Sequence, residues 1–177
     1  MGDKEVPSWL GETSFEGLFM RGEASRVLAR PGVEAELSGV VADDEVAPKL
    51  RVLANELLVE AGQPSRPELA DAYCRTLPED FAHNWWGMPG QYLERLGRTT
   101  VAFGRRAAPC LSRLFDDRRR LGYFGSEEPT LSKEMQYRVC DLAAYLASEI
   151  LGVEYEDAKE PGARDEFIAG LRANAGL

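Results

Sequence analysis

One segment near the end of the chain, residues 137–152, is apolar on two sides when it is read as a helix. At helical spacing one face carries Val139, Leu142, Ala143, Leu146 and Ile150, and a second face carries Cys140, Ala144, Ala147 and Leu151. Each apolar face needs a neighbour that shields it from water. The segment therefore predicts a middle layer with other helices on both flanks.

Prolines divide much of the remaining chain into segments of similar length. Six of them are separated by 17 to 22 residues: Pro31, Pro48, Pro67, Pro89, Pro109 and Pro129. Proline is favoured in the first turn of a helix, where its missing N–H has no partner to lose, so most of these prolines predict a helix start.

Apolar periodicity and stop signals complete the helix assignment. The expected helices cover about 23–29, 31–42, 48–61, 65–77, 89–104, 109–115, 137–152 and 163–173. Ser65 and Glu68 fit a capping box at the start of the fourth helix. No segment alternates long enough to predict a strand, so the expected fold class is all-α.

The length bounds the domain organisation. With 177 residues, 44% of them hydrophobic, the chain can bury one sizeable core without disulfides or metals. Residues 1–22 mix large apolar side chains with turn-forming residues, which predicts an irregular N-terminal arm that lays its aromatic rings on the domain. Residues 23–177 are expected to form a single α-helical domain.

Two parts of the chain, residues 31–62 and 107–152, share one layout: an apolar helix that ends in Asp-Asp, a loop, and a helix rich in alanine and leucine that ends at a glycine. This layout resembles the HEAT-repeat pattern, in which the second helix carries an arginine followed by packed alanines and leucines. In the second copy residues 118–136 replace the short turn, and Arg138 stands further from the alanines than is usual. The resemblance implies a short HEAT-like stack of antiparallel helical hairpins with two long loops. The alternative is an irregular helical bundle.

The charge of the chain is acidic overall and unevenly distributed. Its net value is −9, from 21 Lys+Arg against 30 Asp+Glu, which disfavours the whole chain as a binder of nucleic acid or of anionic membranes. Residues 94–120, however, hold eight arginines against three acidic residues, so nucleic-acid binding by that segment alone stays open. The N-terminus lacks the apolar core of a signal peptide, and no apolar run approaches the ~20 residues that span a membrane.

The three cysteines, Cys74, Cys110 and Cys140, are odd in number, widely spaced and each part of an apolar helical pattern. We expect reduced core thiols, as in a cytoplasmic protein. No CxxC pair occurs and His83 is the only histidine, so the sequence offers no zinc ligand set and predicts no cofactor.

A first candidate loop, residues 78–90, concentrates aromatic side chains and the single histidine. Trp85 and Trp86 are candidate binding residues, because large rigid rings contribute contact area at little entropic cost. The alternative is that one of them fills a gap between helices. Nearby carboxylates could orient His83 for acid–base catalysis, or a cysteine could pair with it as a nucleophile. The alternative for this histidine is a structural hydrogen bond.

A second candidate loop, residues 116–129, combines basic and aromatic residues between glycines. It predicts a mobile, anion-recognising lobe, because arginine matches carboxylates and phosphates and aromatic rings stack. The candidate binding residues are Arg118, Arg119, Arg120, Tyr123 and Phe124. The alternative is that the acidic residues of the same loop neutralise the arginines and that the aromatic rings cover the core.

No phosphate-binding glycine loop, HExxH, GxSxG or EF-hand pattern occurs in the sequence, which favours a protein that is not an enzyme. The leading hypothesis is a non-catalytic adaptor that binds another protein through a HEAT-like scaffold and the two loops. Two alternatives remain. One is an acidic inhibitor or immunity-type protein that neutralises a basic partner, and the other is a small-ligand-binding or lyase-like enzyme. The sequence predicts neither the oligomeric state nor the identity of a partner.

Overall fold

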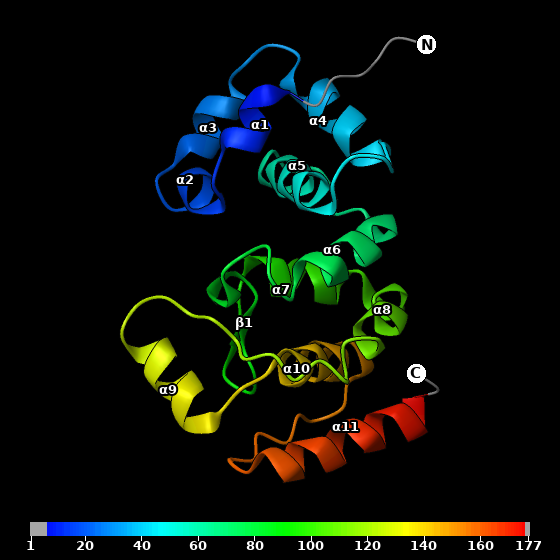
Figure 1. The fold of residues 1–177 in the computed structure, drawn as a ribbon. Coiled ribbons are helices and arrows are strands. Elements are labelled where there is room, and N and C mark those ends of the chain that lie inside the picture. Colours follow the sequence, from blue (N-terminus) through cyan, green and yellow to red (C-terminus); the bar gives the residue numbers. More distant parts are fainter. Residues whose placement is uncertain (1–6, 176–177) are drawn as a thin grey trace. The chain divides into compact units, whose positions relative to one another are not determined.

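The computed structural model describes residues 7–175, without the side chains of residues 174 and 175, and it is mainly helical, with 62% of residues in helices (Figure 1). The sequence analysis expected an N-terminal arm followed by one domain. The chain instead divides into two compact units, residues 1–73 and 74–177, and each is described by itself below. Residues 1–6 of the expected arm lie outside the described residues.

The first unit is built from short helices around one longer helix. Its elements are α1 (Ser8–Glu12), α2 (Phe15–Phe19), α3 (Glu23–Leu28), α4 (Val33–Ala42), α5 (Pro48–Glu60), the 3-10 turn η1 (Pro67–Leu69) and the start of α6 (Ala70–Thr76). Helix α5 packs against α1, α3 and α4. It buries Val52, Leu53, Leu57 and Leu58 almost completely. This helix therefore forms the core of the unit.

The α4–α5 hairpin is closed by an arginine. Arg51 donates two hydrogen bonds, of 3.2 and 3.1 Å, to the carbonyl of Val41 at the end of α4, and it pairs with Asp44 at 2.8 Å. Charge-assisted bonds to a helix C-terminus satisfy carbonyls that have no partner within the helix. In this hairpin, Asp44 of the Asp-Asp turn is therefore bonded to Arg51 of the following helix.

Two details of the first unit differ from the sequence prediction. Residues 8–19 form two short helices, where the sequence predicted an irregular arm, because Ser14 caps α2 through the N–H of Gly17 at 2.9 Å and Leu10 and Leu18 are fully buried. The predicted capping box at Ser65 is not formed. The turn η1 begins at Pro67, and its preceding residue makes no side-chain cap.

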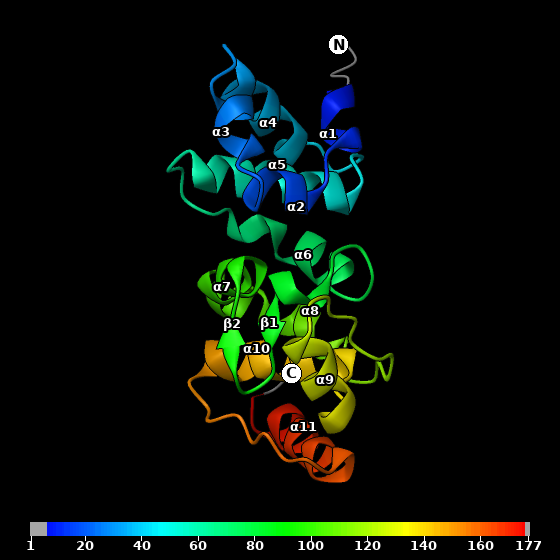
Figure 2. The ribbon, with the colours of Figure 1, turned by 90° about the vertical axis from the view of Figure 1, so that its left-hand side faces the viewer.

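The second unit carries the remaining elements of the described chain. They are the end of α6, η2 (His83–Trp85), β1 (Gly87–Met88), β2 (Tyr92–Leu93), α7 (Arg95–Ala102), η3 (Gly104–Arg106), α8 (Ala108–Ser112), α9 (Glu127–Met135), α10 (Val139–Leu151) and α11 (Pro161–Ala175). Helix α10 packs against α7, α8 and α11, and in two views it lies between α7 and α11 (Figure 1, Figure 2). All residues from Val139 to Ser148 are buried. The prediction of a middle layer is confirmed.

A buried ionic network joins α10 to α11. Arg138 donates to Asp141 through its backbone N–H at 2.9 Å and through its guanidinium at 3.0 and 2.7 Å. Asp141 and Arg164 are both fully buried, and the Nε atom of Arg164 lies 3.3 Å from Asp141. Arg164 also donates to the carbonyls of Met135 at 2.8 Å and Lys159 at 3.0 Å. Arg164 therefore links the end of α9 and the end of the 152–160 linker to Asp141 in the core.

The region around Pro89 differs most from the sequence prediction, which placed a helix over 89–104. Strands β1 and β2 pair antiparallel there, with Gly87 opposite Leu93, and α7 begins only at Arg95. Pro89 and Gly90 occupy a tight turn that is closed by a hydrogen bond of 3.0 Å from the N–H of Gln91 to the carbonyl of Met88. Gly90 has φ +69°, which the second central residue of a type II turn requires. Proline followed by glycine therefore forms a turn here.

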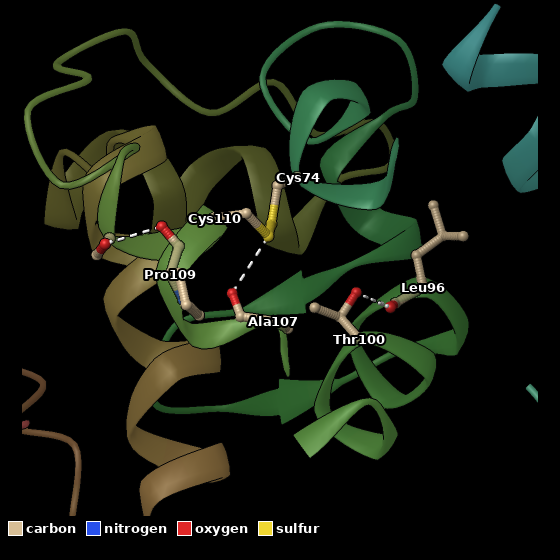
Figure 3. Close-up of a disulfide and its surroundings, with 7 residues drawn as sticks. Cys74, Leu96, Thr100, Ala107, Pro109 and Cys110 are labelled. Carbon is tan, nitrogen blue, oxygen red and sulfur yellow. Dashed lines mark hydrogen bonds between the residues drawn. A yellow bond between two sulfur atoms is a disulfide. The ribbon is translucent and has the colours of Figure 1, made fainter. Parts of the chain in front are cut away.

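The cysteine prediction is wrong for two of the three residues. Cys74 in α6 and Cys110 in α8 form a disulfide, with their Cα atoms 5.9 Å apart (Figure 3). Cys140 is free and buried. The sequence reading missed the pair because the two residues are separated by 36 positions and only the packing of α6 and α8 brings them together.

Candidate functional site

The two loops that the sequence analysis selected lie side by side in the second unit. The N–H of His83 donates to the carbonyl of Gly122 at 3.0 Å, and the N–H of Gly122 donates to Nδ1 of His83 at 2.8 Å. One residue further on, the side-chain amide of Asn84 donates to the carbonyl of Phe124 at 3.0 Å and accepts from its N–H at 2.8 Å. We call residues 83–87 and 120–124 the paired loops. Four hydrogen bonds fix one loop on the other.

His83 is part of this scaffold. It is only 5% exposed, and its Nδ1 lies 2.8 Å from the backbone nitrogen and 3.0 Å from the carbonyl oxygen of Gly122. Burial lowers the pKa of His83 below its ordinary 6.5, although hydrogen bonds to the backbone at Gly122 and Leu77 oppose the shift. The ring is therefore neutral around pH 7, and it contributes to the contact between the two loops.

Cys140 is also not activated as a nucleophile. Burial raises the pKa of its thiol to about 11. Its Sγ lies 3.5 Å from the guanidinium of Arg118 and 3.8 Å from the carboxylate of Asp141. The thiol therefore stays protonated at neutral pH.

The aromatic candidates divide between the core and the surface. Trp86 is fully buried, so its ring offers no area to a partner in this structure. Trp85 is half-buried, with its ring 5.8 Å from the ring of Phe124, which is 44% exposed. Tyr123 belongs to the second of the paired loops, and its hydroxyl donates to the carbonyl of Gly87 in the first at 2.9 Å. Trp85 and Phe124 form a small aromatic surface on the paired loops.

The three candidate arginines also differ from one another. Arg118 pairs with Asp165, and Arg119 pairs with Asp117 at 2.5 Å and with Glu79. Both charges are therefore compensated within the chain. Arg120 instead donates to the backbone carbonyl of Gln136 and, at 2.8 Å, to its side-chain Oε1. These acceptors are neutral, and among the described residues no carboxylate lies within 4.0 Å of the guanidinium of Arg120, so its charge is not compensated there.

A pocket of about 500 Å³ opens between the second loop and α9. Its lining residues are Arg120, Leu121, Gly122, Tyr123, Pro129, Ser132, Lys133, Gln136 and Tyr137. The sequence analysis placed α9 in a loop and so missed its contribution. Four of the lining residues fall at positions 129, 132, 133 and 136, which share one helical face, and this spacing was the available signal.

No protein family matches the sequence, and neither a curated protein nor a solved structure shows significant similarity to the chain. Within residues 7–175, no group of three or more His, Cys, Asp or Glu side chains is placed to hold a metal ion. In the same range no helix combines the length and the apolar character that crossing a bilayer requires. The site must therefore be judged from its own chemistry.

Proposed function

We propose that the chain is a non-catalytic adaptor that binds another protein through the paired loops. The observation that carries the proposal is Phe124, an exposed aromatic residue whose backbone N–H and carbonyl are both held by Asn84. Buried aromatic anchors supply much of the affinity of protein interfaces. An anchor that is already fixed in place loses little conformational freedom on binding.

The proposed scaffold is HEAT-like. Two pairs of packed helices, α4 with α5 and α8 with α10, support this part of the proposal. In the first pair, the ion pair between Asp44 and Arg51 supports the resemblance, because it joins the turn of one helix to the arginine of the next. In the second pair α9 is inserted between the two helices, and Arg138 pairs with Asp141 and Asp165.

The proposal includes a cytoplasmic location. In that compartment glutathione keeps most thiols reduced, so the Cys74–Cys110 disulfide of the structure counts against this part of the proposal. All three cysteines are buried, so the test is alkylation during cell lysis in denaturant, followed by mass spectrometry. Three alkylated cysteines support the cytoplasm, whereas a Cys74–Cys110 bond that is already present indicates an oxidising compartment.

A capture experiment from lysate of the source cells tests the adaptor function. The wild type is compared with Phe124→Ala and with Val153→Ala, which truncates a residue of similar exposure, 45%, in the same unit. Circular dichroism first establishes that both variants are folded. The proposal predicts that a protein captured by the wild type and by Val153→Ala is lost with Phe124→Ala. Equal capture by both variants, or no captured protein at all, contradicts it.

One observation favours a second candidate, the acidic inhibitor. Residues 1–73 hold seven basic against fourteen acidic residues, so the first unit accounts for most of the negative charge of the chain. Such a surface suits a basic partner. For this candidate, association with the captured protein weakens steeply as the salt concentration rises, and it does not respond to Phe124→Ala.

A further inference from the structure

We propose that the pocket between residues 120–123 and α9 binds a small oxyanion, a carboxylate or phosphate group attached to a short apolar body. This site does not depend on the proposed adaptor function, because Phe124 is not among the residues that line the pocket.

Two positive charges in the pocket wall lack a compensating charge. Among the described residues, no carboxylate lies within 4.0 Å of the side-chain nitrogens of Arg120 or Lys133. The guanidinium of Arg120 has five N–H donors, of which Gln136 accepts two, one through its backbone carbonyl and one through its side chain. Lys133 is exposed, and its ammonium brings three further donors. The pocket therefore offers several charged donors that a ligand can use.

Three neighbouring carboxylates, Glu128, Glu134 and Asp157, lie outside the pocket wall, although Glu128 is near enough to contribute to the raised pKa of Tyr123. Glu134 pairs with Lys159 at 2.7 Å. Asp157 accepts from the hydroxyl of Tyr137 at 2.7 and 2.9 Å and from Gln91 at 3.0 Å. None of the lining residues is acidic, so an entering anion meets two cations on the wall itself. The donors to Asp157 are neutral, so this carboxylate keeps its negative charge behind Tyr137.

Gln136 holds Arg120 in the pocket from a strained position. It has φ +57° at the C-cap of α9, and it is the one non-glycine residue with positive φ in the described part of the chain. Such backbone conformations cluster at functional sites, where the surrounding structure maintains them. Gln136 keeps this strained conformation, and its carbonyl and side chain together orient the guanidinium of Arg120.

The remaining wall sets the size and character of the ligand. Leu121, Pro129 and the rings of Tyr123 and Tyr137 supply apolar area around the two charges. Burial raises the pKa of both tyrosines, so their hydroxyls stay neutral and do not repel an anion. A volume of about 500 Å³ lies within the range of small-molecule sites. These features suit an oxyanion that carries an aromatic ring or a short aliphatic chain.

Isothermal titration of the full chain with three separate probes tests the inference. The probes are inorganic phosphate, 4-hydroxyphenylacetate and the neutral analogue 4-hydroxybenzyl alcohol. The expected result is saturable binding of at least one of the two anions and none of the alcohol. The anion that binds more tightly decides between a phosphate and a carboxylate ligand. No saturation by either anion at about 50 mM overturns the proposal.

Matched variants locate the binding. Lys133→Gln and Arg120→Gln each weaken anion binding by about tenfold, since each removes one charged donor group. Arg106→Gln, which changes an exposed arginine of the same unit outside the pocket, leaves the Kd unchanged. Lys133 is itself exposed, so its variant folds even if Arg120→Gln does not. Equal affinity in wild type and Lys133→Gln overturns the site. Phe124→Ala keeps full anion affinity, which separates this test from that of the adaptor function.

Discussion

Replacement of Gly97 by alanine tests how closely α7 approaches the segment that supports the paired loops. In an exposed helix interior this change stabilises by about 1 kcal/mol, because alanine has the higher helix propensity. At position 97, however, the new Cβ would lie 2.0 Å from the carbonyl oxygen of Trp86 and 3.3 Å from a methyl group of Leu93. Contacts under 3.0 Å are not tolerated, so α7 and the backbone of Trp86 must separate by about 1 Å.

That separation has a cost that exceeds the propensity gain. The same carbonyl of Trp86 accepts a hydrogen bond of 3.2 Å from Glu94, so it cannot move freely. Overpacking of a rigid site costs about 3 kcal/mol at the upper end of its usual range. The propensity gain of about 1 kcal/mol offsets part of this, and we expect a net destabilisation of about 2 kcal/mol.

The assay is thermal unfolding followed by circular dichroism, with a matched glycine as control. Gly97→Ala lowers the Tm by roughly 4 to 8 °C. Gly170→Ala, in the interior of α11 with open space around the new Cβ, leaves the Tm unchanged or raises it. Hydrogen exchange localises the loss of protection to α7 and β1. If Gly97→Ala is as stable as the wild type, the close approach of α7 to Trp86 is refuted.

Three further perturbations address the second unit. Arg164→Met leaves buried polar groups without a partner, so it lowers the free energy of unfolding in urea by about 3 to 5 kcal/mol. The control, Arg172→Ala, removes an exposed ion pair and leaves the unfolding midpoint near that of the wild type. The Cys74–Cys110 disulfide closes a loop of 36 residues, so its reduction lowers the free energy of unfolding by about 4 kcal/mol. Cys110→Ser has the stability of the reduced wild type. An unfolding midpoint that does not change with dithiothreitol counts against the bond. Burial lowers the pKa of His83 in the folded state, so the stability that it contributes is complete above pH 6.5 and is lost as the pH falls below 6.5 towards the folded-state pKa. His83→Gln removes this part of the pH dependence, and identical pH profiles for variant and wild type contradict the assignment.

Whether a local signal in the sequence predicts the structure depends on the neighbouring residues, as the prolines illustrate. Pro48 is the first residue of α5, as predicted, because an apolar helical pattern follows it. Pro89 carries the same signal, but Gly90 follows and adopts φ +69°, so the chain turns back into β2. A proline-glycine pair was therefore the better local clue at that position.

The sequence pattern predicted the two loops of the candidate site, but it did not predict the pocket. Trp85 and Trp86 are neighbours in the sequence and equally apolar, yet one is half-buried and the other is fully buried. Composition marked Arg120 as a candidate, but Lys133 lies on α9 and Gln136 is its C-cap, and the sequence pattern predicted a loop there. The glutamates and proline at residues 127–129 resemble a helix start and were a usable signal.

The sequence by itself determined the elements that local periodicity encodes. Helix α10 is a middle layer because its apolar residues recur on two faces, a pattern that exists before any tertiary contact forms. Only the tertiary structure decided which distant residues meet. The Cys74–Cys110 bond, the pairing of His83 with Gly122 and the approach of Arg120 to α9 join positions that are many residues apart. Such contacts depend on how whole helices pack, and short-range sequence patterns carry no record of that packing.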